Sequence, residues 1–100
     1  MKIQKQIENK ITQSLSPFHL EILNESYMHA VPKDAETHFK IIVVSDKFKS
    51  LPLIKRHQML YALLQEEMKA GVHALALHTF TSEEWNKKEQ IPSSPKCSKK

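Results

Sequence analysis

The sequence contains six histidines and one cysteine, and His73 occupies the most suggestive position among them. It comes two residues after Gly71, the only glycine, where an apolar helical pattern stops and an apolar strand-like run begins. A histidine at such a junction is expected at the end of a sheet, where a metal ion or a partner can reach its ring. We predict that His29, in a long polar loop, comes to the same place.

The elements that must position these histidines follow from periodicity and from helix and strand breakers. An apolar residue recurs every four positions from Ile3 to Leu15, which predicts an amphipathic helix that ends before Pro17. Thr81 and Glu84 have the spacing of a capping box. The predicted elements are a helix over residues 3–15, strands over 18–25 and 37–45, a helix over 53–70, a strand over 72–80 and a short helix carrying Trp85. This is an α+β fold of order α-β-β-α-β-α, with a three-stranded mixed sheet and helices mainly on one face.

The topology brings the histidines to two ends of this sheet. A strand, a helix and a further strand form a β-α-β unit, whose right-handed crossover makes the two strands parallel, so both begin at the same end. The loop of residues 26–36 enters the sheet at that end. We therefore expect His29, His38 and His73 to cluster, while His19 and His78 belong to the opposite end.

Alternation along residues 72–80 refines the position of His73. It shares one face of the strand with Leu75 and Leu77, which we expect to point toward the helices, so His73 should lie at the rim of the core. Two imidazoles make half of a site for zinc, copper or iron, because a closed tetrahedral site needs four ligands. Either the histidines are hydrogen-bonded rim residues, or a partner supplies the missing ligands. His57, on the long helix, is interpreted as structural.

The net charge of +4 belongs to the end of the chain. Residues 87–100 hold five lysines and one glutamate, a net of +4, so residues 1–86 sum to zero. We predict a folded domain over residues 1–88 and a disordered basic tail over residues 89–100. A balanced domain with Arg56 as its single arginine gives little support to sequence-specific DNA reading.

Several other classes of function find no support in the residues. No apolar run approaches the roughly 20 residues that span a bilayer, and no signal peptide is apparent, so a cytoplasmic protein is the default expectation. Cys97 alone cannot form an internal disulfide. A single glycine excludes a phosphate-binding glycine loop. The pairs Glu66–Glu67 and Glu83–Glu84 are expected to be solvated, and we predict that the chain is not an enzyme.

Five separated segments, in the right order, resemble the BolA family: residues 24–32, 36–40, 44–48, 53–57 and 72–79. The resemblance covers about residues 3–95. It implies a fold similar to the class II KH domain and no enzyme activity. It also implies that a monothiol glutaredoxin of the Cys-Gly-Phe-Ser type is the partner, and that the two proteins share a [2Fe–2S] cluster.

The same resemblance implies the ligands of that cluster. His73 matches the family histidine that opens the last strand, and His29 matches the ligand in the loop between the first two strands. The glutaredoxin cysteine and a glutathione thiol would complete a Rieske-like set of two nitrogen and two sulfur ligands. The isolated chain is then expected to be a monomer without a cofactor.

Bacterial members of the family are also described as DNA-binding regulators of stress response and cell morphology, which gives an alternative function. The family stretch linked to that role is Phe-x-Gly followed by Arg-His-Arg. Here Ser50 replaces the glycine and Gln58 the second arginine, so the candidate residues for promoter DNA are Lys55, Arg56 and His57. A small interaction domain with purely structural histidines is a third possibility.

Overall fold

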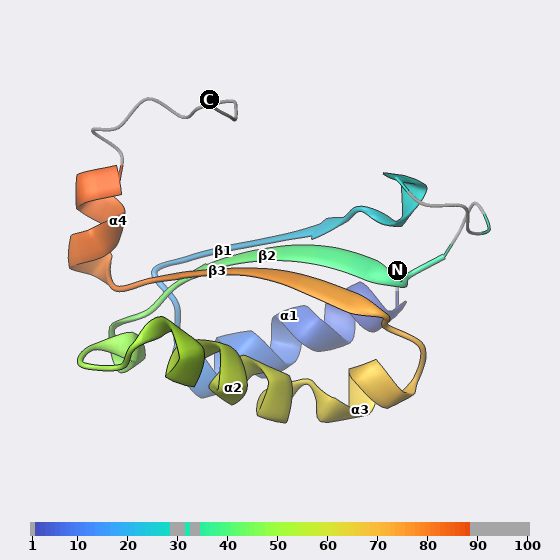
Figure 1. The fold of residues 1–100 in the computed structure, drawn as a ribbon, viewed down its shortest axis with the longest axis horizontal. Helices are drawn as coiled ribbons and strands as arrows, with labels where there is room; N and C mark the ends of the chain where they lie inside the picture. Colours follow the sequence, from blue (N-terminus) through green and yellow to red (C-terminus); the bar gives the residue numbers. More distant parts are fainter. Residues whose placement is uncertain (1, 29–31, 33–34, 89–100) are drawn as a thin grey trace.

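The computed structural model describes residues 2–28, 32 and 35–88 of the chain and has the predicted order of elements (Figure 1). The helices are α1 (Lys2–Leu15), α2 (Leu53–Leu63), α3 (Gln65–Lys69) and α4 (Ser82–Lys88), and the strands are β1 (His19–Asn24), β2 (His38–Val44) and β3 (Ala74–Phe80). The strands lie in the order β1-β2-β3. β1 pairs antiparallel with β2, and β3 pairs parallel with β2, so the predicted mixed sheet is confirmed.

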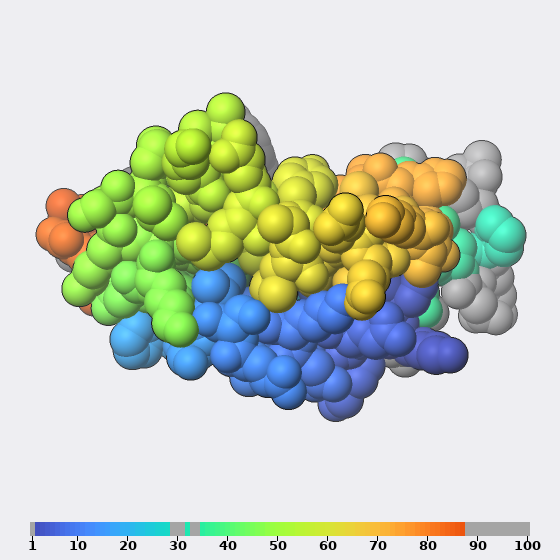
Figure 2. Space-filling view, turned by 90° about the horizontal axis from the view of Figure 1, so that it is seen from below, coloured from blue at the N-terminus to red at the C-terminus, as the bar shows by residue number. Residues whose placement is uncertain are grey.

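One face of the sheet is covered by α1, α2 and α3, which lie below it in Figure 1. Figure 2 shows this side, with α1 in blue running alongside α2 and α3 in green and yellow. The core between the layers contains the stripe of α1 that the sequence predicted, with Ile7 and Ile11 fully buried. From the sheet, Phe39, Ile41 and Val43 of β2 point into it. Every second residue of β2 and every fourth residue of α1 therefore face the shared core between the sheet and the helices.

The prediction for β3 is also confirmed, because Leu75 is buried and Leu77 partly buried against the core. The alternate residues Ala74, Ala76 and His78 are exposed on the opposite face of the sheet. In Figure 1 this second face carries none of the helices α1 to α3, and α4 stands at one end of it. The two ends of the sheet therefore have different surroundings.

The single long helix predicted over residues 53–70 is divided. Leu64, between α2 and α3, has φ −103° and ψ 21°, outside the helical region. Its side chain is fully buried, as is that of Leu60 one turn earlier. In α3, Glu67 is buried and lies 2.9 Å from Lys10 of α1, which the apolar pattern does not reveal.

Gly71 follows the end of α3 and takes φ +131°. Nothing lies within 4 Å of the position that a Cβ atom would occupy there. The glycine is therefore required by its backbone angle and not by lack of space. Among the described residues no helix is long and apolar enough to cross a membrane.

Candidate functional site

His73 lies immediately before β3, at the end of the sheet where β2 also begins. β3 starts at Ala74, two residues later than predicted, and Ala74 is paired with His38. The backbone N–H of His73 donates to the carbonyl of Thr37 at 2.7 Å, which ties this junction to the start of β2. The side chain of His73 is exposed, so its ring is more open to solvent than a rim position of the core would allow.

The structure brings His38 and His73 together, as the parallel pairing predicted. The centroids of the two imidazole rings lie 6.0 Å apart, with an angle of 59° between the ring planes. The Nδ1 atom of His38 is hydrogen-bonded to Oγ1 of Thr37 at 2.8 Å. One nitrogen of this ring is therefore held by the side chain of the residue that immediately precedes β2.

The buried side chain of Ser26 organises the start of β2. Its Oγ accepts hydrogen bonds from the backbone N–H groups of Thr37 at 2.9 Å and of His38 at 3.1 Å. The Oγ1 atom of Thr37 lies 3.3 Å from the same oxygen. Ser26 begins a 3₁₀ turn, Ser26–Met28, and its own N–H donates to Oδ1 of Asn24. This turn is thus fixed to the strand end that carries the two histidines.

His29 lies outside the described residues, so its position beside His73 stays a prediction. The chain can be followed to Met28, and both Tyr27 and Met28 are exposed. Within the part of the chain that the structure describes, no three His, Cys, Asp or Glu side chains come together as a metal site. The described donor set at this end consists of the two imidazoles of His38 and His73.

The opposite end of the sheet has a different histidine environment. His19, at the start of β1, places Nε2 2.6 Å from Oε2 of Glu21. Its ring stacks on Trp85 of α4 with centroids 5.0 Å apart and 22° between the planes, and Trp85 also contacts Phe80 at 5.3 Å. This stacking connects α4 to the sheet, so His19 has a structural role here.

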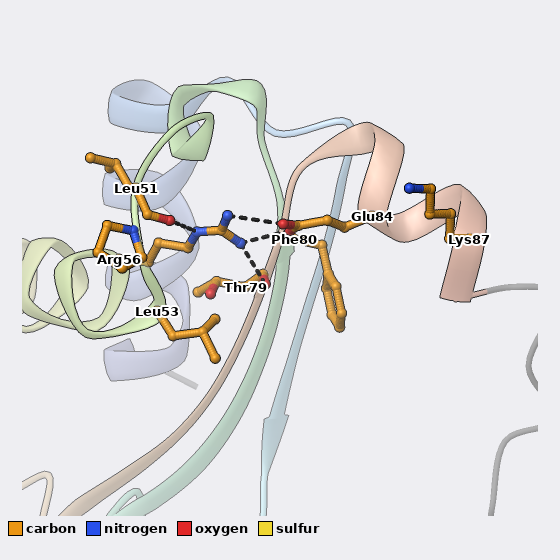
Figure 3. Close-up of a pocket in the computed structure, with 8 residues that line it drawn as sticks. Leu51, Leu53, Arg56, Thr79, Phe80, Glu84 and Lys87 are labelled. Atoms are coloured by element: carbon orange, nitrogen blue, oxygen red, sulfur yellow. Dashed lines mark hydrogen bonds and ion pairs between the residues drawn. The ribbon is translucent and has the colours of Figure 1, made fainter.

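Arg56, predicted as a candidate nucleic-acid contact, points into the protein. Its side chain is only 7% exposed. Nε donates to the carbonyl of Leu51 at 2.8 Å, and Nη1 donates to the carbonyl of Thr79 at 3.3 Å (Figure 3). The two terminal nitrogens also donate to the two carboxylate oxygens of Glu84, at 2.7 and 3.0 Å. All three guanidinium nitrogens thus donate hydrogen bonds, and these connect α2 to β3 and α4.

These residues line a cleft of about 620 Å³ at the end of the sheet away from His73. Its lining also includes Leu53, Phe80 and Lys87 (Figure 3). The cleft is mostly apolar and its one buried cation is already paired, so it offers no free charge for a phosphate from Arg56. Of the other two candidates, Lys55 is exposed and His57 partly buried.

Glu84 is exposed, as the sequence predicted, but its carboxylate also pairs with Arg56. The hydrogen bond from Arg56 holds the pKa of Glu84 below its ordinary value, and the backbone N–H of Thr81 lowers it further. That N–H donates to Glu84 at 2.9 Å, and the N–H of Glu84 donates back to Oγ1 of Thr81 at 3.2 Å, so the predicted capping box is confirmed. The sequence pattern did not indicate that Arg56, which is 28 residues away, pairs with Glu84.

Glu67 is a carboxylate that the sequence placed wrongly in solvent. Its side chain is 3% exposed and lies 2.9 Å from Nζ of Lys10 on α1. Lys10 also contacts Glu66 at 2.9 Å, and that neighbour is exposed as predicted. The hydrogen bonds that Lys10 donates to Glu66 and Glu67 raise the pKa of Lys10. This triad joins α1 to α3 and has no part in the histidine site.

Comparison with known proteins gives the class to which this fold and site belong. The family model described as BolA-like protein matches residues 11–84. A protein of Haemophilus influenzae named DNA-binding transcriptional regulator BolA is 47% identical over 98 residues, covering 97% of this chain and 95% of the relative. The chain belongs to the BolA family.

Solved structures agree with this assignment. The solution structure of BolA1 from Mus musculus superposes with a TM-score of 0.82 at 39% identity, covering 99% of this chain and 80% of the mouse chain. The BolA domain of SufE1 from Arabidopsis thaliana gives a TM-score of 0.79 at 42% identity, over 84% and 96% of the two chains. The names of these relatives describe regulators and BolA domains, and none of them describes an enzyme.

Proposed function

We propose that this chain is an adaptor that binds a monothiol glutaredoxin of the Cys-Gly-Phe-Ser type and contributes His29 and His73 to a shared [2Fe–2S] cluster. Its role would be iron–sulfur trafficking or iron and stress signalling. The observation that carries the proposal is the exposed ring of His73 at the end of the sheet that the loop of residue 29 enters. A ligand to a cluster shared between two proteins must be open to the partner in this way.

The donor chemistry fits such a cluster. Imidazole nitrogens bind one iron of a Rieske-type [2Fe–2S] cluster, with thiolates on the other iron. The thiolates would come from the glutaredoxin cysteine and from glutathione, as the family resemblance implies. The exposed Tyr27 and Met28, next to residue 29, offer apolar area to a partner at the same end. The chain's own contribution is thus two nitrogen ligands and a contact surface.

The test is anaerobic reconstitution of the full chain with a monothiol glutaredoxin, glutathione, iron and sulfide. Visible circular dichroism and electron paramagnetic resonance of the reduced sample report the ligand set. We expect a Rieske-like signal that His73→Ala abolishes and that His29→Ala weakens, while His78→Ala, at the other end of β3, leaves it unchanged. A mixed nitrogen and sulfur signal that persists without His73 would overturn the assignment.

A second candidate function is DNA-binding transcriptional regulation, and the name of the Haemophilus influenzae relative favours it. On this chain the exposed Lys55 and the basic residues 89–100 would supply the contacts to DNA phosphates. Arg56 would support the fold and not the DNA contact, because its guanidinium is occupied by Glu84 and two carbonyls.

Promoter binding measured against salt separates a regulator from a basic tail that binds any DNA. Each lost phosphate contact lowers the slope of log affinity against log salt by about 0.9. A regulator would keep its preference for one promoter after deletion of residues 89–100, and Lys55→Ala would reduce the slope by about one contact. Loss of all preference after the deletion would reject this function for the folded domain.

A further inference from the structure

We propose that Ser26 is a positioning residue for the shared cluster, because its buried hydroxyl fixes, through the peptide group that follows Thr37, the backbone of His73. The inference rests on the proposed function and adds to it a residue that acts through its neighbours and not as a ligand. Ser26 also begins the 3₁₀ turn Ser26–Met28, from which the chain continues to residue 29. One side chain would thus connect the approach to residue 29 with the position of His73.

Ser26 differs in burial from the two residues that follow it. Its exposed fraction is 3%, whereas that of Tyr27 is 77% and that of Met28 is 58%. The polar side chain of this turn therefore points inward, and the two apolar side chains beside it do not. A buried hydroxyl costs free energy unless it is hydrogen-bonded, so its inward position depends on partners inside the protein.

The partners of Ser26 are backbone groups at the start of β2. Its Oγ accepts hydrogen bonds from the N–H of Thr37 at 2.9 Å and from the N–H of His38 at 3.1 Å. A hydroxyl oxygen has two lone pairs, and these two donors occupy them. Alanine at position 26 would offer no acceptor, whereas threonine would keep the same oxygen.

The peptide group between Thr37 and His38 carries this connection across to β3. Its N–H donates to Ser26, and its carbonyl accepts from the N–H of His73 at 2.7 Å and from the N–H of Ala74 at 3.2 Å. The N–H and the carbonyl of a planar trans peptide point in opposite directions, so this group is a rigid link between Ser26 and His73. A displacement on the serine side would therefore be passed to the histidine backbone.

The position of its backbone matters especially for His73. Its side chain is exposed, so packing contributes little to holding the ring in one place. From a fixed Cα atom the imidazole has only two side-chain torsions to adjust. Residues that support a metal ligand from outside the coordination sphere typically contribute 10- to 100-fold in affinity or activity. Ser26 would supply such support through the backbone.

Asn24 holds the turn from its other side. Its Oδ1 accepts from the N–H of Ser26 at 3.0 Å, and its Nδ2 donates to the carbonyl of Ala35 at 3.0 Å. Asn24 and Ser26 together join the beginning of the loop to its end, where β2 starts. The turn that leads toward residue 29 is thereby held in a defined position relative to His73.

The experiment uses the full chain reconstituted anaerobically with a monothiol glutaredoxin, glutathione, iron and sulfide. Ser26→Ala removes the acceptor, and Ser26→Thr keeps it. Glu36→Gln is the matched structural control at the same end of the sheet. The carboxylate of Glu36 accepts from the N–H groups of Ile3 and Gln4 at 3.2 and 3.1 Å, so this substitution weakens the attachment of α1 and spares the hydrogen bonds of Ser26.

We expect Ser26→Ala to shorten the lifetime of the mixed nitrogen and sulfur cluster about tenfold and to change the g-values of the reduced sample in electron paramagnetic resonance. Ser26→Thr should restore both, and Glu36→Gln should leave the g-values unchanged. In the isolated chain, amide hydrogen exchange of His73 should become faster in Ser26→Ala than in the unchanged chain. If Ser26→Ala does not fold by circular dichroism, Asn24→Ala, which removes the acceptor of the Ser26 N–H, should give a smaller change in the same direction.

Two results would overturn the inference. One is a cluster whose lifetime and g-values are unchanged in Ser26→Ala, or in Asn24→Ala where that variant replaces it. The other is an equal change in Glu36→Gln, which would mean that Ser26 supports only the fold. A spectrum that depends on His73 and not on Ser26 would reject the positioning role and keep the adaptor function. A complex of the unchanged chain without any mixed nitrogen and sulfur spectrum would reject the shared cluster, and this inference with it.

Discussion

Arg56 and Glu84 face each other in a two-point ion pair, with Nη1 2.7 Å from Oε1 and Nη2 3.0 Å from Oε2. The pair joins the first turn of α2 to α4, which otherwise contacts the sheet through Trp85. The arginine side is buried and the glutamate side is about half exposed. Arg56 is therefore a structural residue that sits within a sequence motif linked to DNA binding.

Replacing Arg56 should destabilise the fold more than replacing Lys55, the charged residue before it in the sequence. Arg56→Gln removes the ion pair and the donors to Leu51 and Thr79, leaving buried carbonyls without partners, and we expect a loss of about 2 kcal/mol in the free energy of unfolding. Lys55→Ala, at an exposed position, should change it by less than about 0.5 kcal/mol. Urea unfolding measures both. Equal effects of the two substitutions would contradict the structural role.

The same ion pair predicts a dependence of stability on pH. Because Arg56 lowers the pKa of Glu84 in the folded state, the unfolded chain binds more protons in acid than the folded chain does. The stabilisation is fully present above the ordinary glutamate pKa, and it is lost as the pH falls through the lowered value. Glu84→Gln should therefore lower stability at pH 7 and flatten its decline between about pH 5 and pH 3.

Glu83→Gln is the control for this measurement. Glu83 is exposed and lies 3.7 Å from Lys87, a surface pair of the kind that contributes little. Its removal should leave the acid dependence of the unfolding free energy as it is in the unchanged chain. If the unfolding free energies of Glu83→Gln and Glu84→Gln both fell with decreasing pH as steeply as that of the unchanged chain, another carboxylate would be responsible for the acid dependence. Asp46, whose pKa is lowered by the backbone N–H of Ser82, would be the next to replace.

Lys10 and Glu67 form a second distant pair, and a double-mutant cycle should reveal their coupling. Lys10→Met leaves the buried carboxylate of Glu67 without its cation and should lower the free energy of unfolding. Adding Glu67→Met should recover most of that loss, because an apolar pair tolerates burial. Glu66→Gln, at an exposed position, should cost little. Additive effects of the two methionine substitutions would contradict the coupling.

The sequence alone predicted the structure correctly where the hydrophobic periodicity within one helix or strand determines it. The repeat of four from Ile3 to Leu15 and the alternation around Leu75 correctly predicted which residues face the core, although Ile3 and Leu77 are only partly buried. The parallel pairing then followed from the handedness of the crossover and correctly brought His38 close to His73. These inferences need only the pattern within one element and one topological rule.

The sequence alone did not predict the ion pairs between side chains that lie far apart in the chain. Glu84 and Arg56 are 28 residues apart and Glu67 and Lys10 are 57 apart, so no local pattern indicates either pair. The helix break at Leu64 was not indicated by the apolar pattern either. The one available signal was the apolar surroundings of Glu67, since a carboxylate between buried positions of a helix often has a cation opposite it.

Ser26 provides a last prediction, which connects the stability of the sheet end to the histidine site. Its buried Oγ accepts from the N–H groups of Thr37 and His38, so Ser26→Ala leaves both backbone donors without this partner. Each unsatisfied buried donor costs about 1–3 kcal/mol, and the loss should fall on the start of β2. Amide hydrogen exchange should speed up at Thr37 and His38 before it does in the centre of β2. Uniform acceleration along β2 would instead mean that Ser26 supports the whole fold and has no particular part in holding His38.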